Sequence, residues 1–213
     1  MNLIITGPQG SGKGTQARLL AEKMGLVHLE TGEMFRQIAE KNTAFGREVK
    51  AWINRGVLVP DREVVRLLRQ ILTREVLKKG FILDGSPRTL PQIKWLDKIL
   101  AKKNNQIDKL IYLNISKKES IRRLQARRIC PKCGRNYNML TMPPKNDELC
   151  DECDVKLVIR EDETPQAIVK RLKEYHSQTS PMINYYRKKG KVVEINGEQT
   201  VKDVLKDILG KLK

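Results

Sequence analysis

The chain has 213 residues, of which 39% are hydrophobic and 31% charged, and its formal net charge is +17. This composition is typical of a soluble globular protein with one substantial core, and it excludes a bilayer-spanning segment, since no apolar stretch approaches about 20 residues. The charge predicts attraction to polyanions such as nucleotides, nucleic acids or acidic surfaces, although the low aromatic content of 5% argues against a single-strand nucleic-acid binder.

Short β-rich runs alternate with helical patterns along the chain, which is typical of an α/β protein with a parallel sheet and crossover helices. The predicted strands are 2–6, 27–29, 81–84, 109–115 and 191–195. The predicted helices are 12–24, 32–42, 45–55, 63–79, 90–104, 117–128, 165–189 and 201–212. Pro181 is expected to kink or interrupt the helix at 165–189.

Two segments interrupt the alternation of strands and helices. Residues 31–60 form a helical excursion between the second and third strands, and residues 128–162 lack helical periodicity and contain all four cysteines. Both are interpreted as insertions in one core domain. That core domain then comprises residues 1–30, 61–127 and 163–213.

A glycine-rich turn follows the first predicted strand and precedes a helix. It contains Gly7-x-x-x-x-Gly12-Lys13, followed by Gly14 and Thr15. Glycines allow successive backbone N–H groups to point at phosphate oxygens, the helix adds its positive end, and the lysine reaches the outer phosphates. The spacing therefore predicts a phosphate-binding loop, and it leaves open which reaction the phosphate undergoes.

The stretch "FILDGSPRT" offers a carboxylate and a guanidinium at the end of the third predicted strand. Asp84 can face the phosphates and hold Mg²⁺ through water, and Arg88 can form a two-pronged contact with a phosphate. The plainer alternative is that Asp84 caps a helix and that Arg88 forms a surface ion pair.

The insertion at 31–60 begins and ends with distinctive residues. Thr31 is expected to be a helix N-cap, and Arg36 projects from the first turns of that helix. The apolar turn "GVLVPD" at 56–61 is suited to a flat base. Ordinary helix capping and loop packing would explain the same residues.

The cysteines form two pairs, Cys130-x₂-Cys133 and Cys150-x₂-Cys153, with 16 residues between them. This spacing is typical of a four-cysteine zinc site, and disulfides are disfavoured in a cytosolic chain. A closed site has no open position for catalysis, so the zinc is expected to be structural and to stiffen a small lobe.

Arginines occur on both sides of this lobe. Arg123 and Arg127 are four apart and are expected on one helix face, Arg160 lies just beyond the second cysteine pair, and Arg171 lies in the following helix. Together they could close onto a polyphosphate. His28 is interpreted as structural, and the chain offers no nucleophilic Ser, Cys or Lys constellation.

With these residues in hand, the chain closely resembles the adenylate kinase family, in its long form with a zinc-bearing lid. The motifs "GSGKGTQ", "TGEMFR", "GVLVPD", "DGSPRT", the cysteine pairs and "KRLKEYH" occur in the family's order over essentially the whole length. The resemblance implies a P-loop three-layer sandwich with a five-stranded parallel sheet. Residues 31–60 would be a helical insertion that binds the nucleoside monophosphate, and 128–162 a zinc-bearing lid over ATP.

The resemblance also assigns site residues. The residues expected to bind ATP are Gly10, Ser11, Gly12, Lys13, Gly14, Thr15, Arg123, Arg127, Tyr137 and Gln199. The residues expected to bind AMP are Thr31, Arg36, Gly56, Val57, Leu58, Val59, Gly85, Arg88, Gln92, Arg160 and Arg171. The residues expected to act in catalysis are Lys13, Arg88, Arg123, Arg160, Arg171 and Asp84, the last supporting Mg²⁺.

The implied reaction is reversible transfer between ATP and AMP to give ADP. Its acceptor is already an oxyanion, so positioning and charge neutralisation are sufficient for catalysis, with closure that excludes water. Ser86 stands where the family usually has Phe, which could relax discrimination among monophosphates.

Two alternatives stay open. One is a broad-specificity nucleoside monophosphate kinase, and the other is a nucleic-acid-binding P-loop ATPase with a zinc ribbon. The favoured interpretation expects no specific nucleic-acid partner and no membrane contact. It also expects a cytoplasmic location, because the N-terminal residues lack the pattern of a signal peptide. A monomer is favoured, with an oligomer left open.

Overall fold

The computed structural model describes residues 1–159 and 165–212. Five parallel strands form the main sheet, in the order β2-β3-β1-β4-β7. They are β1 (Asn2–Thr6), β2 (Val27–Glu30), β3 (Phe81–Asp84), β4 (Lys109–Asn114) and β7 (Val192–Asn196). All five strands were predicted within one residue at each end, and β1 and β3 are buried along their whole length, as is typical of a doubly covered parallel sheet.

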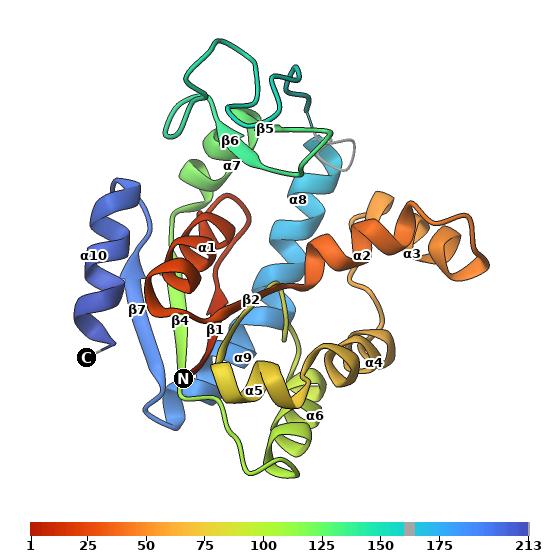
Figure 1. Cartoon of the computed structure of the whole chain (residues 1–213), viewed down its shortest axis with the longest axis vertical. Coiled ribbons are helices and arrows are strands. Elements are labelled where there is room, and N and C mark those ends of the chain that lie inside the picture. The colour runs from red at the N-terminus through yellow and green to blue at the C-terminus, as the bar shows by residue number, and fades with distance from the viewer. Residues whose placement is uncertain (160–164, 213) are drawn as a thin grey trace.

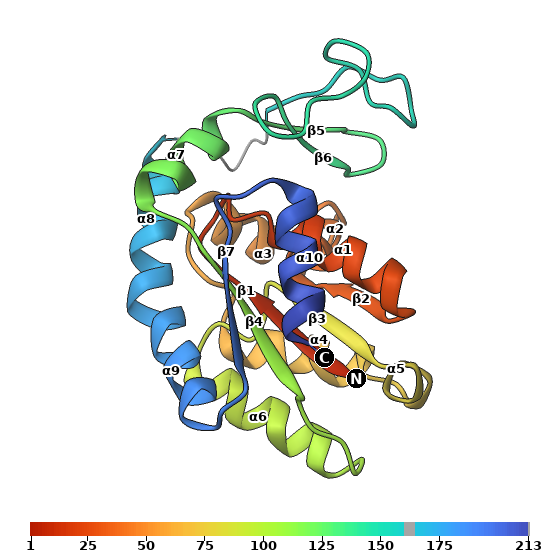
Figure 2. The same ribbon diagram turned by 90° about the vertical axis from the view of Figure 1, so that its left-hand side faces the viewer.

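Helices cover both faces of the sheet and complete three layers, as Figures 1 and 2 show. The helices α1 (Lys13–Met24) and α10 (Val201–Lys211) pack on one face, and α6 (Leu90–Ala101) and α9 (Ser180–Lys188) lie on the other. Alternate residues of β1 point to opposite faces. Leu3 and Ile5 accordingly join the core beneath α1 and α10, whereas Ile4 joins the core beneath α6 and α9.

The first insertion is helical, as expected, and consists of α2 (Thr31–Ala39) and α3 (Ala44–Asn54). These two helices pack on each other, and α3 begins at the N-cap Thr43, whose side chain accepts a hydrogen bond from the Gly46 amide. The chain then returns to the core through the turn at 55–60.

The single helix expected over 63–79 is instead two helices, α4 (Asp61–Ile71) and α5 (Arg74–Lys79). Leu72 leaves the helical region with ψ of 64°, and Thr73 caps α5 by accepting a hydrogen bond from the Val76 amide. A buried leucine followed by a capping threonine thus ends one helix and begins the next.

The second insertion follows α7 (Lys117–Gln125), which ends three residues earlier than expected. It contains a small antiparallel sheet of β5 (Arg127–Ile129) and β6 (Asn136–Asn138), which the sequence did not predict because each strand has only three residues. In Figure 1 this lobe lies at the top of the molecule, above α1 and α8.

The helix expected over 165–189 has three parts. They are α8 (Pro165–Glu174), a π-helical turn over Tyr175–Thr179, and α9. The interruption precedes Pro181, which lies in the first turn of α9, where its missing N–H is tolerated. Within the described part of the chain, no helix is long and apolar enough to cross a membrane.

Candidate active site

The glycine-rich turn lies between β1 and α1 and presents backbone to the cleft. Gly10 has φ of 80°, and a Cβ there would lie 2.9 Å from the Ser120 carbonyl oxygen, so only glycine fits the close approach to α7. Gly12 is the N-cap of α1, also in the left-handed region, and it brings no side chain to the first amides of the helix. The helix terminus is therefore built for an anion rather than for its own cap.

Lys13 begins α1, and its ammonium lies inside the site. Its Nζ donates to the Pro8 carbonyl oxygen at 3.4 Å, so the side chain folds back over the turn. Burial lowers the pKa of Lys13 to about 8, and the charge of Asp84 opposes that shift. The lysine therefore still carries most of its positive charge at neutral pH and loses it above about pH 8.

Asp84 ends β3 at the carboxyl edge of the sheet, as predicted, and its side chain is buried. A Cβ on Gly14 would lie 3.2 Å from Asp84 Oδ2, which shows how closely the carboxylate approaches the phosphate loop. His28 Nε2 lies 3.8 Å from the same oxygen. His28 was interpreted as structural and does not line the cleft, but it lies near Asp84 because strands β2 and β3 are neighbours.

Thr31 is not an N-cap. Glu30 is the N-cap of α2, and Thr31 is the first helical residue, with its hydroxyl donating to the Asp84 carbonyl oxygen at 3.1 Å. The threonine therefore ties the start of the insertion to the end of β3. This bond joins residues 53 positions apart, so no local capping pattern could predict it.

Arg36 projects from α2 into the cleft between two carboxylates. Its Nε donates to Glu33 at 2.9 Å, and its Nη2 donates to Glu30 at 3.1 Å. Burial and the nearby Asp84 raise the pKa of Glu30. Sequence reasoning did not single out Glu30 or Glu33, since acidic residues are not expected beside a phosphate.

Arg88 is held by the turn that follows β3. Its Nε donates to the Gly85 carbonyl oxygen at 2.6 Å, and its amide donates to Gln92 Oε1 at 2.7 Å. The Gln92 amide group in turn donates to Asp61 at 2.7 Å. The Ser86–Pro87 peptide bond in this turn is cis. The loop is thereby fixed to the N-termini of both α4 and α6.

Three further arginines approach from α7, β5 and α8 (Pro165–Glu174). Arg123 lies on α7, and its Nε donates to Glu119 at 2.6 Å. Arg127 does not share a helix face with it, since α7 ends at Gln125 and Arg127 begins β5. Arg171 lies on α8, where its Nη2 donates to the Ile53 carbonyl oxygen at 3.4 Å. Arg160 lies outside the described residues, as does the start of the core segment expected at 163.

These residues meet in one cleft of ≈ 590 Å³, a size suited to small molecules. Its lining includes every described residue that was expected to contact nucleotide. They are Gly10 to Thr15, Thr31, Arg36, Gly56 to Val59, Asp84, Gly85, Arg88, Gln92, Arg123, Arg127, Tyr137, Arg171 and Gln199. The individual roles of these residues stay predictions, but the fold does bring them together.

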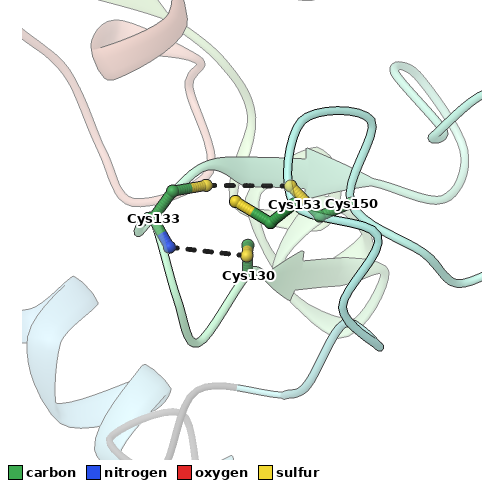
Figure 3. A group of neighbouring side chains, drawn as sticks. All are labelled: Cys130, Cys133, Cys150 and Cys153. Carbon is green, nitrogen blue, oxygen red and sulfur yellow. Dashed lines mark hydrogen bonds between the residues drawn. The ribbon is translucent and has the colours of Figure 1, made fainter.

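The four cysteines converge in the second insertion, as Figure 3 shows. Their sulfur atoms all lie within 4.8 Å of one another, and Cys133 Sγ is 3.7 Å from Cys150 Sγ. The Cys133 amide donates to Cys130 Sγ at 3.5 Å. A soft, four-sulfur donor set of this size fits Zn²⁺.

Tyr137 supports this cluster from β6. Its hydroxyl accepts a bond from the Asp151 amide at 2.9 Å and lies 3.4 Å from Cys150 Sγ. This contact lowers the pKa of Cys150, whereas the contact with Cys133 raises the pKa of Cys153. Tyr137 therefore joins the cysteine cluster to the cleft that it also lines.

A doubly covered parallel sheet, a glycine-rich loop at a helix N-terminus and an arginine-lined cleft define a P-loop nucleotide-binding protein. Comparison with known proteins narrows this class. The family model described as adenylate kinase matches residues 5–191. The chain belongs to the adenylate kinase family, and it is a nucleoside monophosphate kinase.

The curated relatives are similar over nearly their whole length. The adenylate kinase of Caldanaerobacter subterraneus subsp. tengcongensis is 40% identical over 208 residues, covering 98% of this chain and 94% of that protein. That of Thermotoga neapolitana is 42% identical, with 97% and 94% covered. That of Kosmotoga olearia is 40% identical over 213 residues, with 100% and 99% covered.

Proposed function

We propose that this protein catalyses the magnesium-dependent, reversible reaction ATP + AMP = 2 ADP, by direct in-line transfer of a phosphoryl group. The observation that carries the proposal is that the phosphate loop and the pair Arg36 and Arg88 line the same cleft. One polyphosphate on the loop and one monophosphate on the arginines would then lie end to end, without a covalent enzyme intermediate.

On the ATP side, the amides of residues 10–15 and Lys13 hold the phosphates, and Arg127, Tyr137 and Gln199 border the nucleoside. Gln199 lies in the turn between β7 and α10, and its Nε2 donates to Asp207 Oδ2 at 2.9 Å. Asp84 would hold Mg²⁺ through water, and the ion when bound neutralises charge between the phosphates. Its burial at the strand end, beside the loop, supports this role.

On the AMP side, Arg36 and Arg88 bind the phosphate. The base lies against Thr31, Gln92 and the turn at 56–59, where the side chains are apolar and partly buried. Arg123, Arg160 and Arg171 neutralise the charge of the transferring group. Insertions 31–60 and 128–162 close over the substrates, which removes water as a competing acceptor.

The zinc proposed at Cys130, Cys133, Cys150 and Cys153 is structural, since all four donors come from the protein. It stiffens the lobe that carries Tyr137. The protein is proposed to act as a monomer in the cytoplasm, without a specific nucleic-acid partner.

The test is ADP formation from ATP and Mg²⁺ with AMP, GMP, CMP, UMP or no acceptor. Rapid ADP formation when AMP is the acceptor, and not with the other monophosphates or without an acceptor, supports the proposal. If ATP is consumed at the same rate with and without every monophosphate, water is the acceptor and the ATPase alternative is favoured. Stimulation of that ATP consumption by nucleic acid would support the alternative further.

A broad monophosphate kinase is the second candidate, and Ser86 favours it. Ser86 is buried and lines the cleft, and its hydroxyl has no hydrogen-bond partner within the described chain. A small side chain with an unused hydroxyl could accommodate more than one base. Comparable kcat/KM for AMP and UMP would support this candidate, and a hundredfold preference for AMP, about 2.7 kcal/mol, would exclude it.

A further inference from the structure

Arg36 is already neutralised before any substrate binds. Its guanidinium contacts two carboxylates, Glu33 at 2.7 Å and Glu30 at 3.1 Å, and only 23% of its side chain is exposed. A monophosphate that binds Arg36 must therefore exchange with at least one of these carboxylates.

The Glu33 contact is an ordinary one. Glu33 and Arg36 are three apart on α2, so their pairing is the usual neighbour interaction on a helix surface. Glu33 also faces the cysteine lobe, since a Cβ on Gly134 would lie 3.6 Å from its carboxylate.

The Glu30 contact is not explained by the helix. Glu30 is the N-cap of α2, yet its side chain makes no capping bond and turns into the cleft. There it lies opposite Asp84 on the neighbouring strand, and a carboxylate oxygen of one residue lies within 4.8 Å of a carboxylate oxygen of the other. Like charges across a strand pair are unfavourable, and the contact with Arg36 offsets that repulsion.

We propose that Glu30 is a positioning residue that occupies Arg36 in the empty enzyme as a stand-in for the substrate phosphate, and that the monophosphate displaces it. This inference rests on the proposed function, specifically on Arg36 as a phosphate ligand. A phosphate dianion offers more charge and more acceptor oxygens than a carboxylate, so it can win this exchange, whereas weaker anions cannot. Glu30 thus holds the arginine in place and weakens the binding of every anion that must displace it from Arg36.

A metal ion is the competing explanation, because His28, Glu30 and Asp84 bring one nitrogen and two carboxylates together. The stand-in role is favoured for two reasons. Glu30 already contacts a cation, Arg36, and the positive charge of Lys13 is close enough to Asp84 to interact with it.

The test compares Glu30→Gln with Glu40→Gln, both assayed in the complete protein. Glu40 is exposed, lies at the end of the same helix, and has no ion pair within the described chain, so its variant removes the same charge without touching Arg36. AMP binding is measured by calorimetry, and kcat and KM are measured for AMP and for ATP.

Removing the competing carboxylate should lower the Kd and KM for AMP by about threefold to fivefold, the range of a partly exposed ion pair. The kcat should change by less than about twofold, and KM for ATP should not move. Sulfate should compete with AMP more strongly by a similar factor. Glu40→Gln should match the wild type, and Glu30→Asp, which keeps the charge, should return KM towards it.

Weaker AMP binding by Glu30→Gln would overturn the inference, because Glu30 would then help to build the phosphate site. Equal effects in the two glutamine variants would also overturn it, as would a change confined to Mg²⁺ dependence. Failure of the proposed function would look different: the wild type itself would neither bind AMP nor form ADP from it.

Discussion

Lys13 illustrates how a single residue is prepared for its task. A buried ammonium is unfavourable by itself, and burial lowers its pKa to about 8 while Asp84 keeps most of the charge in place. In the proposed function the ammonium is the form that binds the ATP phosphates, so Lys13 must be protonated for ATP to bind.

A pH dependence follows from this pKa. Below pH 8 Lys13 is protonated, and above it the charge is lost, so kcat/KM for ATP should be flat below about pH 8 and fall roughly tenfold per pH unit above it. In Lys13→Arg the guanidinium stays charged, so the fall should disappear even if the rate is lower throughout. Parallel profiles for the two proteins would assign the fall to another group.

At the same scale, sequence reasoning found the residues that a motif fixes and missed those that the fold brings in. Lys13, Asp84 and Arg88 belong to contiguous patterns, and the cleft contains them. Glu30 lies in the cleft beside Asp84 because β2 pairs with β3 across 50 residues of chain. The residues near position 30 do not by themselves predict that β2 pairs with β3.

At the scale of elements, the acceptor side of the cleft depends on how α4 and α6 begin. Thr89 is the N-cap of α6. Its hydroxyl accepts a bond from the backbone amide of Gln92 at 3.3 Å and donates to the Asp61 carboxylate at 3.0 Å. The same Asp61 accepts from Gln92 at 2.7 Å. One small network therefore sets the angle between the two helices and the loop that carries Arg88.

Thr89→Ala should lower the free energy of unfolding by about 1–2 kcal/mol, since it removes a buried cap and one bond to Asp61. Urea unfolding measures this loss. Thr73→Ala is the matched control, because Thr73 caps α5 but is exposed and makes only the capping bond among the described contacts. Its cost should be smaller, and an equal cost would show that the link to Asp61 contributes nothing.

The cysteine lobe is the element least able to fold alone. Its buried core comprises Cys130, Tyr137, Cys150 and Leu157, too few apolar groups to fix the lobe without a crosslink or a metal. The sequence predicted the zinc site from spacing, but not the short strands β5 and β6. Three-residue strands carry no periodic signal, and these two pair on either side of Cys130 and Cys133.

Cys150→Ser should abolish zinc binding, measured as metal per chain, and should leave amides 127–158 with little protection from hydrogen exchange. The amides of the main sheet should keep theirs, because the sheet core shares no residue with the lobe core. Phosphotransfer should fall at least about tenfold. Unchanged protection of the lobe would show that zinc does not hold it.

At the scale of the whole molecule, the cleft uses only part of the positive charge. Seven described cations line it, namely Lys13, Arg36, Arg88, Arg122, Arg123, Arg127 and Arg171. Other cations lie elsewhere on the surface. For example, Arg69 Cζ and Lys98 Nζ lie 5.4 and 5.3 Å from the centre of the exposed Trp95 ring. The net charge of +17 alone therefore did not reveal the function, whereas the order of motifs did.

The three-layer core was predictable because each strand contains a short β-rich run and helical patterns separate these runs. The breaks within helices were not. The division between α4 and α5, and the π-helical turn before α9, depend on how buried side chains such as Leu72 and Tyr175 pack against other elements. Helical periodicity continues through both positions.

The most direct test of a cleft that joins two nucleotides is the stoichiometry of the reaction. ATP, AMP and Mg²⁺ are mixed with the protein, and ADP and inorganic phosphate are measured together over time. Direct transfer between the loop and the arginine pair predicts two ADP for each ATP consumed, no phosphate, and no reaction when AMP is omitted. One ADP and one phosphate for each ATP, with or without AMP, would contradict it, since the cleft would then deliver the phosphoryl group to water.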